Sequence, residues 1–141
     1  MGEARELGER WFETVRGGDV DAIAALLTDD VDFTTPVEPI SGPREAAAFV
    51  TGYSTAFPDS AFVIERWIEE GDMVVAEGRY TGTNTGPMVG PMGEMPATGK
   101  SVDLPFTTVM QVRDGKLAAQ RAYWDNTTFM MQLGLMPGPG A

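Results

Sequence analysis

The second half of the chain follows the period-two pattern of apolar and polar residues that half-buried β-strands require. Asp114 and Gly115 interrupt this pattern, and an Asp-Gly pair is a strong signal for a two-residue hairpin turn. The tripeptide EGD at residues 70–72 interrupts it in the same way further upstream. The sequence therefore predicts two β-hairpins, built from residues 62–69 with 73–83 and from residues 102–113 with 116–124.

Helical periodicity dominates the part of the chain before these strands. Leu7, Trp11 and Val15 share one face of a first helix, which Gly17 and Gly18 end. A second helix is expected from the cap at residue 19 to residue 27, a short strand at 31–35, a third helix at 43–57 and a last helix after residue 125. Helices followed by long antiparallel strands predict an α+β fold, with a curved sheet wrapped over the helices.

Length and composition limit the number of domains and the classes of partner that the chain can have. The 141 residues have the size of one domain, so a single domain over 1–141 is expected, with a flexible Pro/Gly tail at 137–141. The net charge is −11 and basic residues form no stripe, so nucleic acids and membrane surfaces are not expected as partners. The opening residues lack the pattern of a signal peptide and no apolar run could span a bilayer, which makes a cytoplasmic protein the default expectation.

Histidine and cysteine are both absent from the sequence. Their absence removes disulfides, thiolate nucleophiles, His-based triads and Cys/His metal sites. No phosphate-binding motif is present either. The sequence therefore predicts neither a metal nor an organic cofactor.

One connection is unusually long. Residues 84–100 (NTGPMVGPMGEMPATGK) join two predicted strands and are rich in glycine, proline and methionine. Connections of this length often act as lids, and methionines adapt to apolar ligands. Two interpretations stay open, a lid over a ligand site and an irregular loop that packs on the body.

Several motifs resemble the SnoaL-like polyketide (ester) cyclase branch of the nuclear transport factor 2-like superfamily. They are TGTNTGPM, PATGKSVDLPF, VRDGKL and AYWD…QLGLMP in the second half, and WFETVRGGDVDAIAALLTDDVDF in the first; the resemblance covers residues 3–137. It implies a conical α+β barrel, in which a strongly curved, mostly antiparallel sheet surrounds one deep apolar pocket. It also implies a homodimer through the outer sheet face, although this superfamily hosts both enzymes and binding modules.

The resemblance also places the acid–base groups of the family. SnoaL-like cyclases use an aspartate on the last strand and a histidine on the strand before, and these positions fall on Ala122 and Thr108. Members similar to limonene-epoxide hydrolase use an aspartate at the same place with an Arg-x-Asp motif, where this chain has Arg79 and Thr81. The acid–base machinery of both branches is therefore missing.

Tyr80 and Asp125 remain as catalytic candidates. A phenol such as Tyr80 is a poor base, because its pKa is near 10. Asp125 could act as a substitute acid or could cap the last helix, and strand alternation favours the cap, since it turns Asp125 away from a pocket lined by Gln120 and Ala122.

The remaining pocket candidates are neutral or apolar side chains that could bind the substrate. Asn84 stands where related sequences often carry histidine. The expected substrate-binding set is Trp11, Phe33, Tyr53, Asn84, Met88, Phe106, Thr108, Gln120, Ala122 and Trp124.

Three functions stay open on this basis. The first is a cofactor-independent enzyme that cyclises, isomerises or dehydrates an apolar oxygenated, polyketide-like molecule by positioning it against neutral hydrogen-bond donors. The second is a pocket protein that binds such a ligand without catalysis. The third is a dimerisation module with a vestigial cavity, in which Trp124 and Phe106 would meet across a filled pocket.

Overall fold

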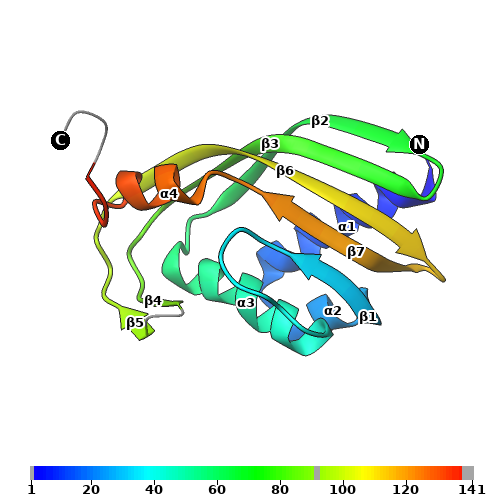
Figure 1. Ribbon diagram of the computed structural model, residues 1–141, viewed down its shortest axis with the longest axis horizontal. Coiled ribbons are helices and arrows are strands. Elements are labelled where there is room, and N and C mark those ends of the chain that lie inside the picture. The colour runs from blue at the N-terminus through cyan, green and yellow to red at the C-terminus, as the bar shows by residue number, and fades with distance from the viewer. Residues whose placement is uncertain (1, 91–92, 138–141) are drawn as a thin grey trace.

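The structure of the protein is a computed structural model that describes residues 2–90 and 93–137. Residues 138–141 of the predicted flexible tail lie outside the described residues. The long helices are α1 (Glu3–Gly17) and α3 (Pro43–Ala56), and the short ones are α2 (Val20–Ala24) and α4 (Asn126–Gln132). Figure 1 shows α1 and α3 on the same side of the sheet, with α4 at the end of the last strand.

Five strands form the main sheet in the order β1-β7-β6-β3-β2. They are β1 (Leu27–Thr34), β2 (Ala61–Glu70), β3 (Met73–Thr83), β6 (Ser101–Arg113) and β7 (Lys116–Tyr123). β1 pairs with β7 in parallel, and the other pairs are antiparallel. These elements confirm the predicted α+β fold with a curved, mostly antiparallel sheet, although the sheet does not close on itself, since β1 and β2 are its two edges.

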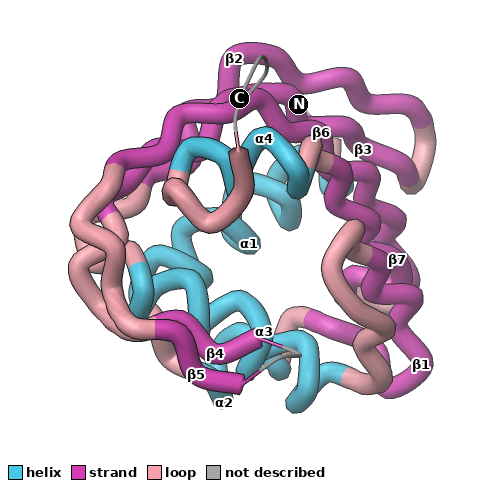
Figure 2. Tube along the Cα trace, turned by 60° about the vertical axis from the view of Figure 1, so that its left-hand side comes forward, coloured by secondary structure: helices cyan, strands magenta, loops and turns pink. Residues whose placement is uncertain are grey.

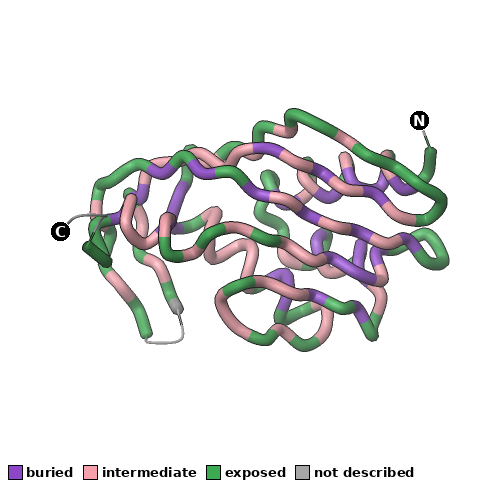
Figure 3. Tube along the Cα trace, turned by 45° about the horizontal axis from the view of Figure 1, so that its top comes forward, coloured by how far each residue is buried: buried purple, intermediate pink, exposed green. Residues whose placement is uncertain are grey.

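The predicted hairpins are present with nearly the predicted bounds. Asp114 has φ 54° and Gly115 has φ 76°, the pair of positive values that a type I′ turn requires. β6, which precedes this turn, has 13 residues in which buried positions alternate with exposed or half-buried ones. Figure 3 shows such alternation of purple with pink and green along the strands. The alternation predicted from sequence therefore sets which face of the sheet each side chain occupies.

The first strand begins earlier than predicted. Sequence periodicity placed Leu26 and Leu27 on the second helix, but α2 ends at Ala24 and β1 starts at Leu27. Leu27 pairs with Leu117 of β7, and both side chains are buried. A distant strand therefore overrides the local helical pattern at this point.

Buried side chains form two clusters between the helices and the sheet. The larger one joins α1, α2 and β1 to the middle of the sheet, and includes Leu7, Trp11 and Ile23. The smaller one lies around α4 and the N-terminal end of β6, and includes Phe57, Leu104 and Phe129. Within the described part of the chain, no helix is long and apolar enough to cross a membrane.

We predict that the protein is a homodimer through the outer face of the sheet. Tyr123 is 50% exposed there and pairs across the strands with Thr107, next to the partly exposed Val109. Burying this apolar surface would favour association. Light scattering at micromolar concentration should give twice the mass of one chain, and Tyr123→Glu should shift the mass towards 15.2 kDa. A wild-type protein that already scatters as a single chain would contradict the prediction.

Candidate functional site

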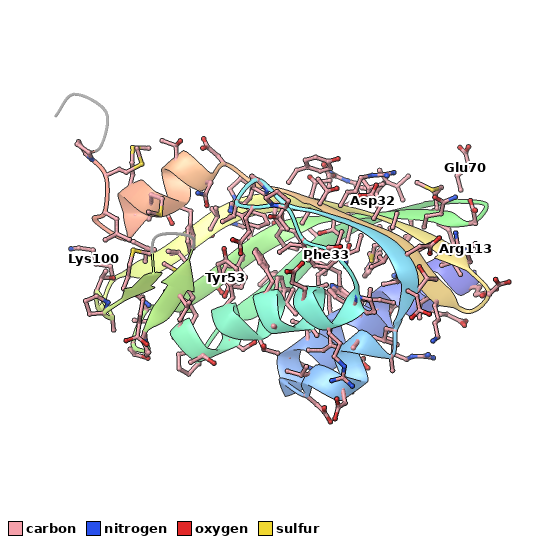
Figure 4. The ribbon with its side chains drawn as sticks, turned by 60° about the horizontal axis from the view of Figure 1, so that its bottom comes forward. Asp32, Phe33, Tyr53, Glu70, Lys100 and Arg113 are labelled. Atoms are coloured by element: carbon pink, nitrogen blue, oxygen red, sulfur yellow. The ribbon has the colours of Figure 1, made fainter. Side chains whose placement is uncertain are left out.

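A cavity of about 110 Å³ lies between the inner face of the sheet and helices α1 and α3. In Figure 2 the main sheet curves over the top and the right-hand side of the molecule, and α2 and α3 lie at the bottom. Figure 4 shows Phe33 of β1 and Tyr53 of α3 between the helix and the sheet. The wall is almost entirely apolar and mostly aromatic, and its residues are Trp11, Phe12, Val15, Phe33, Thr35, Phe49, Val50, Tyr53, Phe62, Tyr80, Leu104, Phe106, Thr108, Gln120, Ala122, Trp124 and Phe129.

The register of the sheet determines which side chains lie beside Thr108. Thr108 of β6 pairs with Ala76 of β3 on one side and with Ala122 of β7 on the other. The inner face therefore carries two alanines beside one threonine at this level, whereas the neighbouring pairs include Phe106 and Met110. Ala122 lines the cavity together with Thr108, whereas Ala76 is fully buried outside the wall.

The polar groups of the wall are few and uncharged. Thr108 is 3% exposed and Gln120 is 2% exposed. The Oε1 atom of Gln120 and the hydroxyl of Tyr80 are buried and have no hydrogen-bond partner of good geometry among the described residues. Buried polar groups in native structures are nearly always paired, so the Gln120 oxygen calls for a partner. The Tyr80 hydroxyl lies close to the Ser60 hydroxyl, although their geometry is poor for a hydrogen bond.

Burial keeps both tyrosines of the wall protonated. It raises the pKa of Tyr80 to about 12, although the nearby Ser60 hydroxyl acts in the opposite direction. Burial, with a smaller contribution from Tyr80, also raises the pKa of Tyr53 well above its usual value. At neutral pH, both side chains can therefore donate hydrogen bonds but cannot act as bases.

Nine of the residues predicted from sequence lie on the wall of the cavity. They are Trp11, Phe33, Tyr53, Tyr80, Phe106, Thr108, Gln120, Ala122 and Trp124. Alternation along β7 brings Gln120 and Ala122 inside together, and Trp124 extends the same side past the end of the strand. Trp124 is held by its Nε1 atom, which donates to Asn126 Oδ1 at 3.2 Å.

Asn84, by contrast, lies outside the wall of the cavity and ties the long connection to the body. It is 1% exposed. Its Nδ2 atom donates to the carbonyls of Ala56 (3.1 Å) and Gly86 (2.9 Å), and its Oδ1 accepts from the Thr98 amide at 2.8 Å and the Thr98 hydroxyl at 3.0 Å. These four hydrogen bonds occupy the side chain, so the structure gives Asn84 a structural position in place of the predicted ligand contact.

Asp125 and Met88 also lie away from the wall. Asp125 caps α4, where its carboxylate accepts from the amides of Thr127 (3.0 Å) and Thr128 (3.2 Å). The hydrogen bonds from Thr128 hold the pKa of Asp125 below its usual range, so it is an exposed carboxylate at neutral pH. Asp125 is thus placed as a helix cap, the alternative that strand alternation favoured over an acid.

Met88 belongs to a small hairpin inside the long connection, formed by β4 (Met88–Gly90) and β5 (Gly93–Met95). It packs beside the smaller buried cluster, together with Tyr53, Tyr80 and Trp124. The hairpin therefore packs against the same buried cluster as three wall residues without being part of the wall. Its role as a lid stays a prediction.

Arg79, at the place of the Arg-x-Asp motif, also points away from the cavity. Its Nε atom is 2.7 Å from Asp103 Oδ1, and both side chains are largely exposed. Alternation along β3 puts Tyr80 on the inner face and Arg79 on the outer one. Across the described residues, no group of three or more acidic side chains is placed to hold a metal ion.

Several wall residues were missed in the sequence prediction, although some carried a usable signal. Phe49 and Val50 share the helical face of Tyr53, and Leu104 has the strand parity of Phe106. Phe12 and Phe62 could not be assigned in this way, because their rings meet at 5.2 Å across two elements that are far apart in sequence. Thr35 gave no signal, since it follows the end of β1.

The comparisons with known proteins agree with this architecture. The family model for the SnoaL-like domain matches residues 8–120. The chain belongs to the SnoaL-like family. No curated protein matches its sequence.

Solved structures with the same fold cover nearly the whole chain. A candidate SnoaL-like polyketide cyclase from Jannaschia sp. CCS1 has 27% sequence identity and a TM-score of 0.81, and the match covers 96% of this chain and 94% of that one. IdmH, a candidate polyketide cyclase from Streptomyces antibioticus, has 23% identity and a TM-score of 0.72, with 94% and 99% covered. TerC, co-crystallised with polyporic acid, has 18% identity and a TM-score of 0.72, with 94% and 99% covered.

Proposed function

We propose that this SnoaL-like protein binds an apolar, oxygen-bearing molecule of polyketide type and promotes its cyclisation, isomerisation or dehydration. The observation that carries this proposal is the character of the cavity wall. It is apolar and aromatic, and it presents unpaired neutral groups at Gln120 and Tyr80. Such a wall suits a ligand that is mostly hydrocarbon and carries a few carbonyl or hydroxyl groups.

Catalysis in this site would rest on position and on neutral hydrogen-bond donors. Ala122 and Thr108 supply neither an acid nor a base, and Tyr53 and Tyr80 stay protonated. A donated hydrogen bond in a dry cavity stabilises the negative charge that develops on a carbonyl oxygen when it enolises. Holding a flexible chain in a folded conformation adds the advantage of proximity.

The same wall supports binding without catalysis as a second candidate function. The supporting observation is that every titratable wall residue is a protonated tyrosine. A dimerisation module with a vestigial cavity has less support, because Trp124 and Phe106 both line open space.

A linear poly-β-ketone thioester distinguishes these functions. Binding of this probe should quench the Trp fluorescence of the protein, because Trp11 and Trp124 lie on the wall. An enzyme should convert the probe to a cyclic product that has lost one water molecule, measured by mass spectrometry. Binding without conversion would support the pocket protein, and no binding would contradict both proposals. Ala122→Leu, which fills the cavity, is the control.

Tyr80→Phe should reduce binding or turnover of a ligand without changing the stability of the protein. The Tyr80 hydroxyl is buried and makes no hydrogen bond of good geometry, although Ser60 lies close to it, so removing it should change the free energy of unfolding by less than about 1 kcal/mol. Binding or turnover of a ketone probe should fall about tenfold, and the wild-type profile should be flat from pH 6 to 9 because the pKa of Tyr80 is about 12. Tyr123→Phe removes a hydroxyl from the outer face of the sheet, away from the cavity, and should leave binding or turnover of the probe unchanged. A large loss of stability in Tyr80→Phe would assign the hydroxyl a structural role instead.

A further inference from the structure

Gln120 places an amide in an apolar part of the cavity. Its side chain is 2% exposed, and its Oε1 atom has no hydrogen-bond partner among the described residues. Its cross-strand neighbours are Met110 on β6 and Phe33 on β1, which offer no polar side-chain atoms. An unpaired amide in such surroundings destabilises the free protein, so its presence points to a partner that arrives with the ligand.

Thr108 provides a second polar group close to this amide. Gln120 pairs with Met110, and Thr108 lies two residues along β6 on the same face, which makes the two side chains diagonal neighbours. Diagonal neighbours are about 7–8 Å apart at their Cα atoms, within reach of one small functional group. On the β7 side of Thr108, the small side chain of Ala122 lies on the same wall and leaves space for that group.

Tyr80 belongs to a different part of the ligand. It pairs with Leu104, whereas Gln120 pairs with Met110, so their levels lie six residues apart along β6. Six residues of strand span about 20 Å, which exceeds the combined reach of the two side chains. Thr108 is therefore the hydroxyl of the β6 and β3 strands that lies beside Gln120, and Tyr80 is not.

The chemistry of an amide defines its partner. A glutamine side chain has a carbonyl acceptor beside two N–H donors, whichever way it is turned. No arginine or lysine lines the cavity among the described residues, so an ionised group would be buried there without a counter-charge. The partner must be neutral and must present both a donor and an acceptor.

We infer that the ligand carries a neutral hydrogen-bond donor next to an acceptor, and that this pair binds the amide of Gln120 with the hydroxyl of Thr108 beside it. An enolised 1,3-dicarbonyl, a hydroxy-ketone or a primary carboxamide meets this description, whereas an isolated ketone does not. This ligand class rests on the binding function proposed above.

Two probes of almost the same shape test the inference. 2-Naphthamide has an N–H donor beside its carbonyl, and 2-acetonaphthone replaces the NH₂ group with a methyl group. Wild-type protein should bind 2-naphthamide about tenfold more tightly, as measured by Trp fluorescence or calorimetry, because only this probe pairs with both sides of the Gln120 amide.

Gln120→Leu should reverse this preference, because the NH₂ group of the amide probe then loses its partner. The same variant should melt at a higher temperature than wild type without ligand, since it removes an unpaired buried amide. Thr108→Val, which keeps the shape of the side chain, should reduce the preference about threefold.

The possible outcomes distinguish a failure of the Gln120 inference from a failure of the proposed binding function. Equal binding of the two probes by wild type, or an unchanged preference in Gln120→Leu, would overturn the inference and leave the binding function in place. A lower melting temperature in Gln120→Leu would also overturn it, because the amide would then be a structural group. If neither probe binds, the proposed function fails and the inference fails with it.

Discussion

Asn84→Ala should lower the free energy of unfolding by about 3 kcal/mol, which corresponds to a fall of roughly 10 °C in the melting temperature. The side chain is 1% exposed and makes four hydrogen bonds. Its removal leaves the carbonyl of Gly86 and the amide of Thr98 without partners, and the carbonyl of Ala56 keeps only its bond from the Gly86 amide. Each unpaired buried group costs about 1 kcal/mol or more.

The loss of the Asn84 side chain should also destabilise the long connection that Asn84 anchors to the body. Gly86 packs so closely against the end of α3 that a Cβ atom there would lie 2.2 Å from the Thr55 carbonyl oxygen. The Gly86 amide also donates to the Ala56 carbonyl at 3.2 Å. Loss of Asn84 should therefore loosen residues 85–99, and hydrogen exchange should detect faster exchange there.

Thr98→Ala is the matched control for this prediction. It removes one donor to Asn84 Oδ1 and the acceptor for the Lys100 amide, while the amide of Thr98 still binds Asn84. Chemical denaturation should show about one third of the loss seen for Asn84→Ala. A loss below about 1 kcal/mol in Asn84→Ala itself would show that the connection is not anchored by this side chain.

Ala122→Asp should make the stability of the protein depend strongly on pH. Ala122 lies half-buried on the apolar wall, opposite Thr108. Burial disfavours the charged carboxylate, so the pKa of the new side chain in the folded state should rise above the value of about 3.9 in the unfolded chain. Even when protonated, the new group should cost about 1–3 kcal/mol without designed partners.

The sign of the pH dependence follows from proton binding. Between about pH 4 and the raised pKa, the folded variant holds a proton that the unfolded chain has released. Raising the pH in this window therefore lowers the free energy of unfolding relative to wild type, by about 1.4 kcal/mol for each unit of pKa shift, and the difference becomes constant above it.

Two control variants isolate the cause. Ala122→Asn has nearly the same shape but does not titrate, so its difference from wild type should not change between pH 4 and 8. Ala61→Asp adds the same charge at an exposed position of β2 and should be as stable as wild type throughout this range. An Ala122→Asp protein that matches wild type at pH 8 would place position 122 in solvent.

Local pattern alone was enough to identify most elements of this fold. Period-two alternation predicted the four long strands, and the Asp-Gly pair at 114–115 predicted a turn with two positive φ angles, because few other residues adopt them at low cost. Alternation along β7 also placed Gln120 and Ala122 on the inner face. The absence of histidine and cysteine limits the chemistry of the site whatever the fold, since no arrangement of the chain can supply an imidazole or a thiolate.

Tertiary structure alone decided the rest, because it depends on contacts between distant segments. Leu27 leaves the helical pattern since Leu117 pairs with it, and Asn84 is turned from the cavity because Ala56 and Thr98 supply its partners. No local pattern encodes the place of Ala76 and Ala122 beside Thr108, which is set by the register of three strands. That register determines which small side chains lie beside Thr108, whereas sequence alternation determines only which side chains face inwards.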